Sequence, residues 1–164
     1  MDTALPGWSD FNVAVAGAGA ALAGLLIVAM SVNITRILEA QTLPARAGAS
    51  IGALVLGLAA ACLALVPGQP VWLLGLEVLA GAVLAWVLEA FAVRAILRER
   101  GQGGPAGRAG KVLAGVLPPA AFTVGGLLLA AGNANGYTWV AAGSVLAIIG
   151  SVLFSWVALV EILR

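Results

Sequence analysis

The sequence predicts an all-α, polytopic integral membrane protein that crosses the bilayer five times and forms a single domain. Of its 164 residues, 62% are hydrophobic and 9% are charged, and the mean hydropathy is +1.10. A soluble domain carries about 25% charged residues, so this chain cannot cover its surface with them. Apolar stretches near the ~20 residues that a transmembrane helix needs alternate with short segments rich in Pro, Gly or charge. The expected spans are residues 11–38, 47–66, 71–97, 112–131 and 138–163.

Small residues recur at helical spacing within the spans. In the first span, Gly17, Gly24 and Ser31 follow one another every seven residues, with Ala14, Ala21 and Thr35 on the same side. Other glycines that share a helix face with small neighbours are Gly48, Gly52, Gly81, Gly143 and Gly150. Small side chains let two helix backbones approach closely in lipid, so these patterns predict helix–helix contacts. No basic residue precedes the first span, which is therefore not expected to be a cleaved signal peptide.

The third span carries two acids, Glu77 and Glu89. On a helical wheel, small residues such as Gly81 fall near Glu77, and tryptophans gather on the far side. A charged carboxylate in hydrocarbon costs roughly 2.5–3.5 kcal/mol on translocon scales, so Glu77 is expected to face other helices. Glu77 is then either a proton or cation site or a carboxyl that hydrogen-bonds a neighbouring helix. Glu89 lies about 120° round the helix and is expected to pair with a basic group or meet water.

Pro118 and Pro119 interrupt the hydrogen bonding of the fourth span, residues 112–131. Each proline lacks an N–H, so the carbonyl groups near Ala114 and Gly115 lose their helical donors and the helix is expected to kink. In lipid, a freed carbonyl must find another partner. The kink is either a packing feature or a hinge.

The placement of Lys and Arg predicts the orientation of the chain. Basic residues flank the first and third loops and end the chain, at Arg36, Arg46, Arg94, Arg98, Arg100, Arg108, Lys111 and Arg164. The segment before the first span and the other two loops have none. Because cytoplasmic loops carry the excess of Lys and Arg, the N-terminus is expected outside and the C-terminus in the cytoplasm. The expected location is the plasma membrane or a bacterial-type inner membrane.

The composition excludes several kinds of chemistry. The chain has no histidine and a single cysteine, Cys62. It therefore lacks the usual zinc, haem and copper ligand sets and any Ser–His or Cys–His catalytic pair. We expect no metal, no cofactor and no catalytic residue. With a net charge of +1, no basic face is expected to bind nucleic acid.

Two functional hypotheses follow. The first is a non-enzymatic membrane protein that acts through helix packing, as a homo-oligomer or as a subunit of a larger membrane complex, with the bilayer and those copies or subunits as its partners. The alternative is a small channel or proton-linked carrier, in which Glu77 titrates, Glu89 acts as an inner relay and Pro118–Pro119 moves. An enzyme is disfavoured because the two glutamates lie about 18 Å apart along one helix axis.

Overall fold

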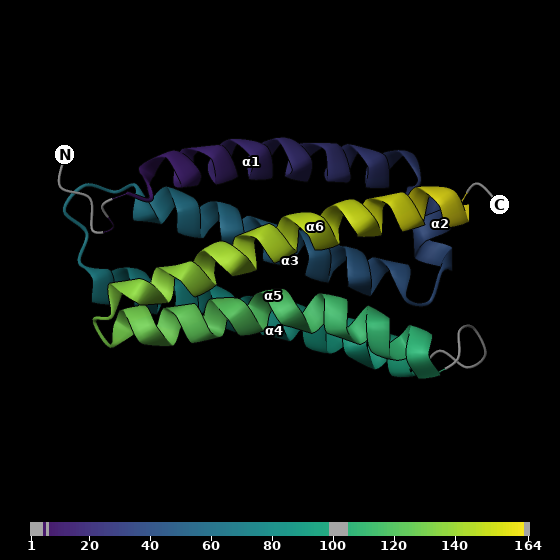
Figure 1. The fold of residues 1–164 in the computed structure, drawn as a ribbon. Coiled ribbons are helices and arrows are strands. Elements are labelled where there is room, and N and C mark those ends of the chain that lie inside the picture. Colours follow the sequence, from purple (N-terminus) through teal and green to yellow (C-terminus); the bar gives the residue numbers. More distant parts are fainter. Residues whose placement is uncertain (1–4, 6, 99–104, 163–164) are drawn as a thin grey trace.

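Every regular element in the described part of the chain is a helix (Figure 1). The computed structural model describes Leu5 and residues 7–98 and 105–162, without the side chains at positions 36, 105, 106 and 157–162. The elements are α1 (Ser9–Val32), α2 (Ile34–Glu39), α3 (Leu43–Ala64), α4 (Val71–Arg98), α5 (Pro105–Ala130), the short 3₁₀ helix η1 (Ala134–Gly136) and α6 (Tyr137–Ile162). Five of these helices are long and apolar enough to cross a membrane. The expected all-helical fold with five such helices is confirmed.

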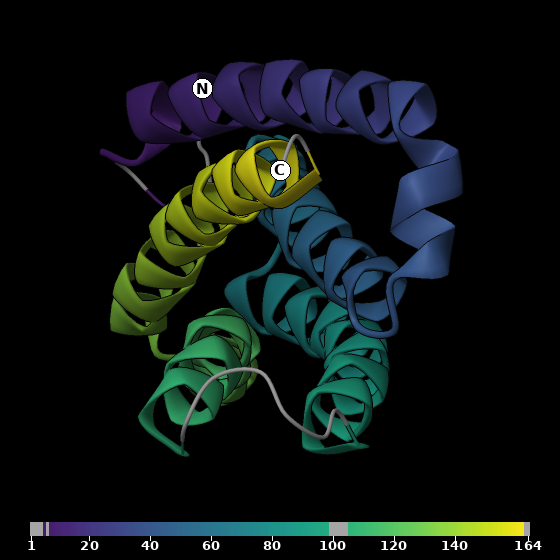
Figure 2. The same cartoon turned by 90° about the vertical axis from the view of Figure 1, so that its right-hand side faces the viewer.

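The helices form three layers. Viewed along the bundle, α1 lies on one side, α3 and α6 form the middle, and α4 and α5 form the other side (Figure 2). The five long helices alternate in direction, so α1 begins at one end of the bundle and α6 finishes at the other (Figure 1). We call the end that holds α2, the start of α3 and the end of α4 the basic end, because the described Lys and Arg residues lie there. The opposite end, which holds the start of α1 and η1, is the far end.

The first span differs from the expected single helix over residues 11–38. The chain leaves the α1 direction at Asn33 and continues as the separate helix α2 (Figure 2). The Asn33 side chain donates to the carbonyl of Ala29 at 3.0 Å, and its backbone N–H bonds the carbonyl of Met30 at 3.2 Å, three residues back. An asparagine amide competes in this way with the regular helical pattern.

Two helices begin earlier than expected because a proline stands in their first turn. The second span was expected from residue 47, yet α3 begins at Leu43 and includes Pro44. The fourth was expected from residue 112, yet α5 begins at Pro105. The first turn of a helix has no use for a backbone donor, so proline starts a helix there instead of breaking it.

A buried polar contact joins α1 to α6 at the far end. The Tyr137 hydroxyl donates to Asn12 Oδ1 at 2.6 Å, and both residues are 1% exposed. The Trp8 ring packs edge-on against the Tyr137 ring, with centroids 5.1 Å apart. Lipid offers no hydrogen-bond partner, so the Tyr137 hydroxyl and the Asn12 side chain satisfy each other.

The helices α4 and α5 touch through their backbones. A Cβ added at Gly75 would lie 2.7 Å from the backbone carbonyl carbon of Leu129, and one added at Gly126 would lie 3.2 Å from the Gly75 oxygen. Small residues at this crossing allow the close approach. By contrast, a Cβ at Gly24 on α1 would meet no atom within 4 Å.

We expect Gly75→Ala to destabilise the bundle. The added methyl meets backbone atoms that cannot rotate away, and overpacking of this kind costs about 1–3 kcal/mol. The matched change Gly110→Ala adds the same methyl to a helical position with no atom within 4 Å and should leave stability unchanged or slightly raised. Thermal unfolding of the purified variants in detergent checks this; equal midpoints for the two would contradict the packing described.

Candidate functional site

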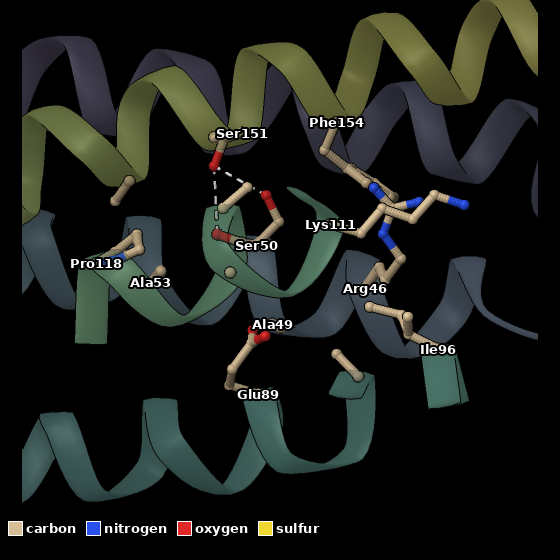
Figure 3. Close-up of a pocket in the computed structure, with 15 residues that line it drawn as sticks. Arg46, Ala49, Ser50, Ala53, Glu89, Ile96, Lys111, Pro118, Ser151 and Phe154 are labelled. Atoms are coloured by element: carbon tan, nitrogen blue, oxygen red, sulfur yellow. Dashed lines mark hydrogen bonds between the residues drawn. The ribbon is translucent and has the colours of Figure 1, made fainter. Parts of the chain in front are cut away.

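A cavity of about 70 Å³ opens among α3, α4, α5 and α6, towards the basic end. Its polar lining consists of Arg46, Ser50, Glu89, Lys111 and Ser151, and the remaining walls are Ala, Gly, Pro, Ile and Phe. A space of this size with several polar groups holds a few water molecules. It brings charged groups from three helices together inside an otherwise apolar bundle (Figure 3).

Glu89 lines the cavity on its α4 side and points into it (Figure 3). It is 5% exposed, and the positive charge of Arg46 acts on its carboxyl group. The carboxyl group rests against Gly115 of α5, where an added Cβ would lie 2.6 Å from the carboxyl carbon. The missing side chain at Gly115 thus makes the room that the carboxyl group occupies.

Arg46 and Lys111 line the part of the cavity nearer the basic end. Arg46 comes from the first turn of α3 and Lys111 from the second turn of α5, and both are half-buried. The Arg46 guanidinium lies 5.5 Å from the centre of the Phe154 ring, within the range of a cation–π interaction. Figure 3 shows the two basic side chains beside Phe154, on one side of Glu89. The cavity therefore has two basic groups on the side nearer the basic end and an acid on the other side of them.

Two serines close the wall between α3 and α6. Ser50 Oγ donates to Ser151 Oγ at 3.1 Å, and Ser151 Oγ lies 3.3 Å from the Ser50 carbonyl oxygen. This pair holds the two helices together beside the cavity and presents hydroxyl oxygens to it (Figure 3).

The prolines of α5 lie beside the same cavity. The helix is continuous from Pro105 to Ala130 and passes through Pro118 and Pro119. Ala114, Gly115 and Pro118 line the cavity, so the cavity lies along the part of α5 in which the prolines remove helical donors. The Thr123 hydroxyl donates to the carbonyl of Pro119, one turn earlier on the same helix, at 2.7 Å.

Glu77 lies outside the cavity, half-buried, and its carboxylate accepts a hydrogen bond from Gln69 Nε2. Glu77 was expected to point into the bundle, and it lies at the edge of the packed face of α4. Glu89 was expected to pair with a basic group or meet water, and it lies within the packed face, near Arg46. The buried residues of α4, which include Val78, Ala82 and Glu89, are centred roughly 100° round the helix from Glu77. The helical wheel places the packed face at the small residues near Glu77, such as Gly81. It is wrong because lipid-facing positions on this helix are small as well.

The seven glycines expected at helix contacts fall into two groups. Three have a side chain of a neighbouring helix within 4 Å of an added Cβ: Gly52 against Leu88, Gly81 against Leu56, and Gly143 against Phe122. Those with no atom within 4 Å of an added Cβ are Gly17, Gly24, Gly48 and Gly150. Sequence reasoning did not single out Gly75, Gly115 or Gly126, which make closer contacts than most of the seven.

Comparison of the chain with protein-family models, with curated proteins and with solved structures finds no match. The function therefore has to be argued from the cavity and from the exposed helix faces. Sequence reasoning had used Arg46 and Lys111 for orientation only. Their position in the first two turns of helices that pack around Glu89 is the signal that could have placed them at a site.

Proposed function

We propose that this protein is a small, non-enzymatic, proton-linked membrane carrier with Glu89 as the group that binds and releases the proton. The observation that carries the proposal is an acid, 5% exposed, that faces a cavity lined also by Arg46 and Lys111. Ionisable groups within a membrane are expensive and mark binding sites or proton pathways. Glu89 takes the central role that the sequence hypothesis gave to Glu77.

The apolar core beyond the cavity supports a carrier rather than an open channel. Between Glu89 and the far end lies a cluster that includes Leu74, Val78 and Phe122, each no more than 1% exposed. This packed apolar layer separates Glu89 from the far end. The conformation then corresponds to a carrier open towards one side, with Pro118 and Pro119 beside the site as the hinge.

We further propose that the basic end faces the cytoplasm, in a plasma membrane or bacterial-type inner membrane. The support is the gathering of the described Lys and Arg residues at that end, which the positive-inside rule relates to the cytoplasmic side. The start of α1 then lies outside, and the proton reaches Glu89 from the cytoplasm.

A second function, helix packing with another copy or another membrane subunit, is favoured by one face of α1. The small residues of this α1 stripe are Ala14, Gly17, Ala21, Gly24 and Ser31, and all are exposed. The residues that α1 buries, which include Val15 and Leu26, lie on the opposite side of the helix. A small-residue face that no helix of the described chain covers suits close contact with a partner in the bilayer.

We expect Glu89→Gln to lower proton flux into liposomes at least tenfold under an imposed potential. The amide keeps the size of the side chain but can neither carry the charge nor exchange the proton. The matched control Glu77→Gln changes an acid of the same helix outside the cavity and should leave the flux unchanged. Equal flux from the wild type and Glu89→Gln, or no flux from either, would remove the carrier proposal.

Thiol labelling tests the orientation and the hydration of the cavity together. In a Cys62→Ser background, Ser50→Cys should react with a membrane-impermeant thiol reagent in inside-out vesicles and not in intact cells, because the thiolate forms only where water reaches. Asn133→Cys, in the turn at the far end, should react in intact cells. The reverse pattern would overturn the orientation.

Crosslinking in membranes tests the α1 stripe. Gly24→Leu should reduce a crosslinked dimer or complex several-fold, because the larger side chain keeps the partner backbone away. Ala18→Leu adds a similar side chain at an exposed position about 100° round the helix and should keep it. Monomer alone in the wild type would exclude this function.

A further inference from the structure

We propose that residues 107–117 of α5 form an arm that moves to widen and narrow the cavity at Glu89. The following part of the helix, residues 118–130, begins with the two prolines and stays fixed on α4. We call it the anchored segment, and a hydrogen bond between Trp86 and Thr123 is the contact that holds it beside the hinge. The inference rests on the proposed carrier and names the part of it that moves.

The two parts of α5 differ in how deeply they are buried. No residue of the arm is buried by the described chain, and a Cβ added at Gly107 or Gly110 would meet no atom within 4 Å. The anchored segment, by contrast, contains these buried residues: Pro118, Pro119, Ala121, Phe122, Gly125, Gly126 and Leu129. Segments with few buried contacts open at the lowest cost in free energy. The change in burial coincides with the prolines, so α5 is firmly held on one side of them and loosely held on the other.

The prolines weaken the helix at this boundary. Pro118 and Pro119 have no N–H, so the carbonyls of Ala114 and Gly115, four residues earlier, receive no helical hydrogen bond. Two consecutive bonds are therefore absent from the last turn of the arm, and sharp bends in helices occur at such places. Because α5 continues as a helix on both sides of the prolines, the arm can change its angle and keep its own helical structure.

Beyond the prolines, two linked hydrogen bonds tie α5 to α4. Trp86 Nε1 donates to Thr123 Oγ1 at 3.0 Å, and Thr123 Oγ1 donates to the Pro119 carbonyl at 2.7 Å. One hydroxyl group thus accepts from the neighbouring helix and donates to the first turn of the anchored segment. Further along, a Cβ added at Gly126 would lie 3.2 Å from the Gly75 oxygen, so the anchored segment and α4 are in contact there as well.

The depth of Trp86 makes this contact costly to break. Trp86 lies near the middle of α4, roughly 20 Å of helix rise from either end, whereas tryptophans of membrane helices gather at the headgroup level. Its side chain is 37% exposed, and lipid at this depth has no acceptor for the indole N–H. Loss of the bond to Thr123 would leave that donor unsatisfied, so the bond opposes separation of the anchored segment from α4.

Movement of the arm would act directly on the cavity. Lys111, Ala114 and Gly115 of the arm line it, and the Glu89 carboxyl group occupies the space that a side chain at Gly115 would fill. The other lining residues belong to α3, α4 and α6 and to the anchored segment at Pro118. A change in the angle of the arm against these fixed walls therefore changes the access to Glu89.

Distances between pairs of spin labels on the full-length protein in liposomes test the inference. In a Cys62→Ser background, the arm pair carries labels at Gly110→Cys and Phe91→Cys, and the anchor pair carries labels at Leu127→Cys and Leu76→Cys. All four labelled positions are exposed, and each pair joins α5 to α4. We expect the distance distribution of the arm pair to be at least twice as wide as that of the anchor pair. Equal widths, or a wider anchor pair, would overturn the inference.

Variants of Thr123 and Trp86 test the anchoring hydrogen bond. Thr123→Val keeps nearly the same size and lacks the hydroxyl group, so it should widen the distribution of the anchor pair at least twofold. Thr123→Ser keeps the hydroxyl group and should leave that distribution unchanged. Trp86→Phe removes the indole donor and should act as Thr123→Val does. Thermal unfolding shows that each variant is folded, and an unchanged anchor pair in both Thr123→Val and Trp86→Phe would remove the role given to the bond.

Replacement of both prolines tests the hinge. Pro118→Ala combined with Pro119→Ala restores the two missing N–H donors, so the distribution of the arm pair should narrow to the width of the anchor pair. Proton flux into liposomes should fall at least fivefold in the same variant. An arm pair that stays wide, or a narrow arm pair with unchanged flux, would contradict the inference.

These failures differ from failure of the carrier proposal. A wide arm pair in a protein without any Glu89-dependent flux would leave the movable arm and remove the carrier. Flux that depends on Glu89 in a protein whose two pairs are equally narrow would leave the carrier and remove the arm.

Discussion

The contact between α4 and α5 determines where everything else in the bundle lies. Towards the far end, Gly75 and Gly126 let the two backbones meet. Towards the basic end, Gly115 gives up its side-chain space to the Glu89 carboxyl group. Lipid offers no partner to polar groups, so a carboxyl group can sit in this seam only if protein or water surrounds it. Glycines on facing helix surfaces therefore have two effects. Towards the far end they allow backbone contact, and towards the basic end they leave room for a polar group.

The cavity combines groups that come from distant parts of the chain. Arg46 and Ser50 belong to α3, Glu89 to α4, Lys111 to α5 and Ser151 to α6. The apolar layer around Phe122 lies between these groups and the far end. Polar groups on one side and an apolar layer on the other give the site a direction, and the proposed transport depends on that direction.

Composition and hydropathy were sufficient to predict the helices, because a span in lipid has to be long, apolar and helical. They were insufficient to predict which face of α4 is buried, since small residues occur on its lipid-facing side as well as at its contacts. Gly24 and Gly75 stand in similar local sequence, yet one meets open space and the other meets the Leu129 backbone. Periodicity describes one helix at a time, whereas the place of Glu89 depends on the neighbours that the whole fold brings to it.

The hydrogen bond between Asn12 and Tyr137 has a consequence for assembly. Synthesis delivers α1 long before α6, and chains fold from the N-terminus as they emerge. Until the last helix is inserted, the Asn12 amide sits in the first helix without the hydroxyl that satisfies it. The hydrogen bond between the first and last helices therefore forms only when α6 is inserted. In earlier intermediates the Asn12 amide has no Tyr137 partner, and contact with water is the more favourable state for it.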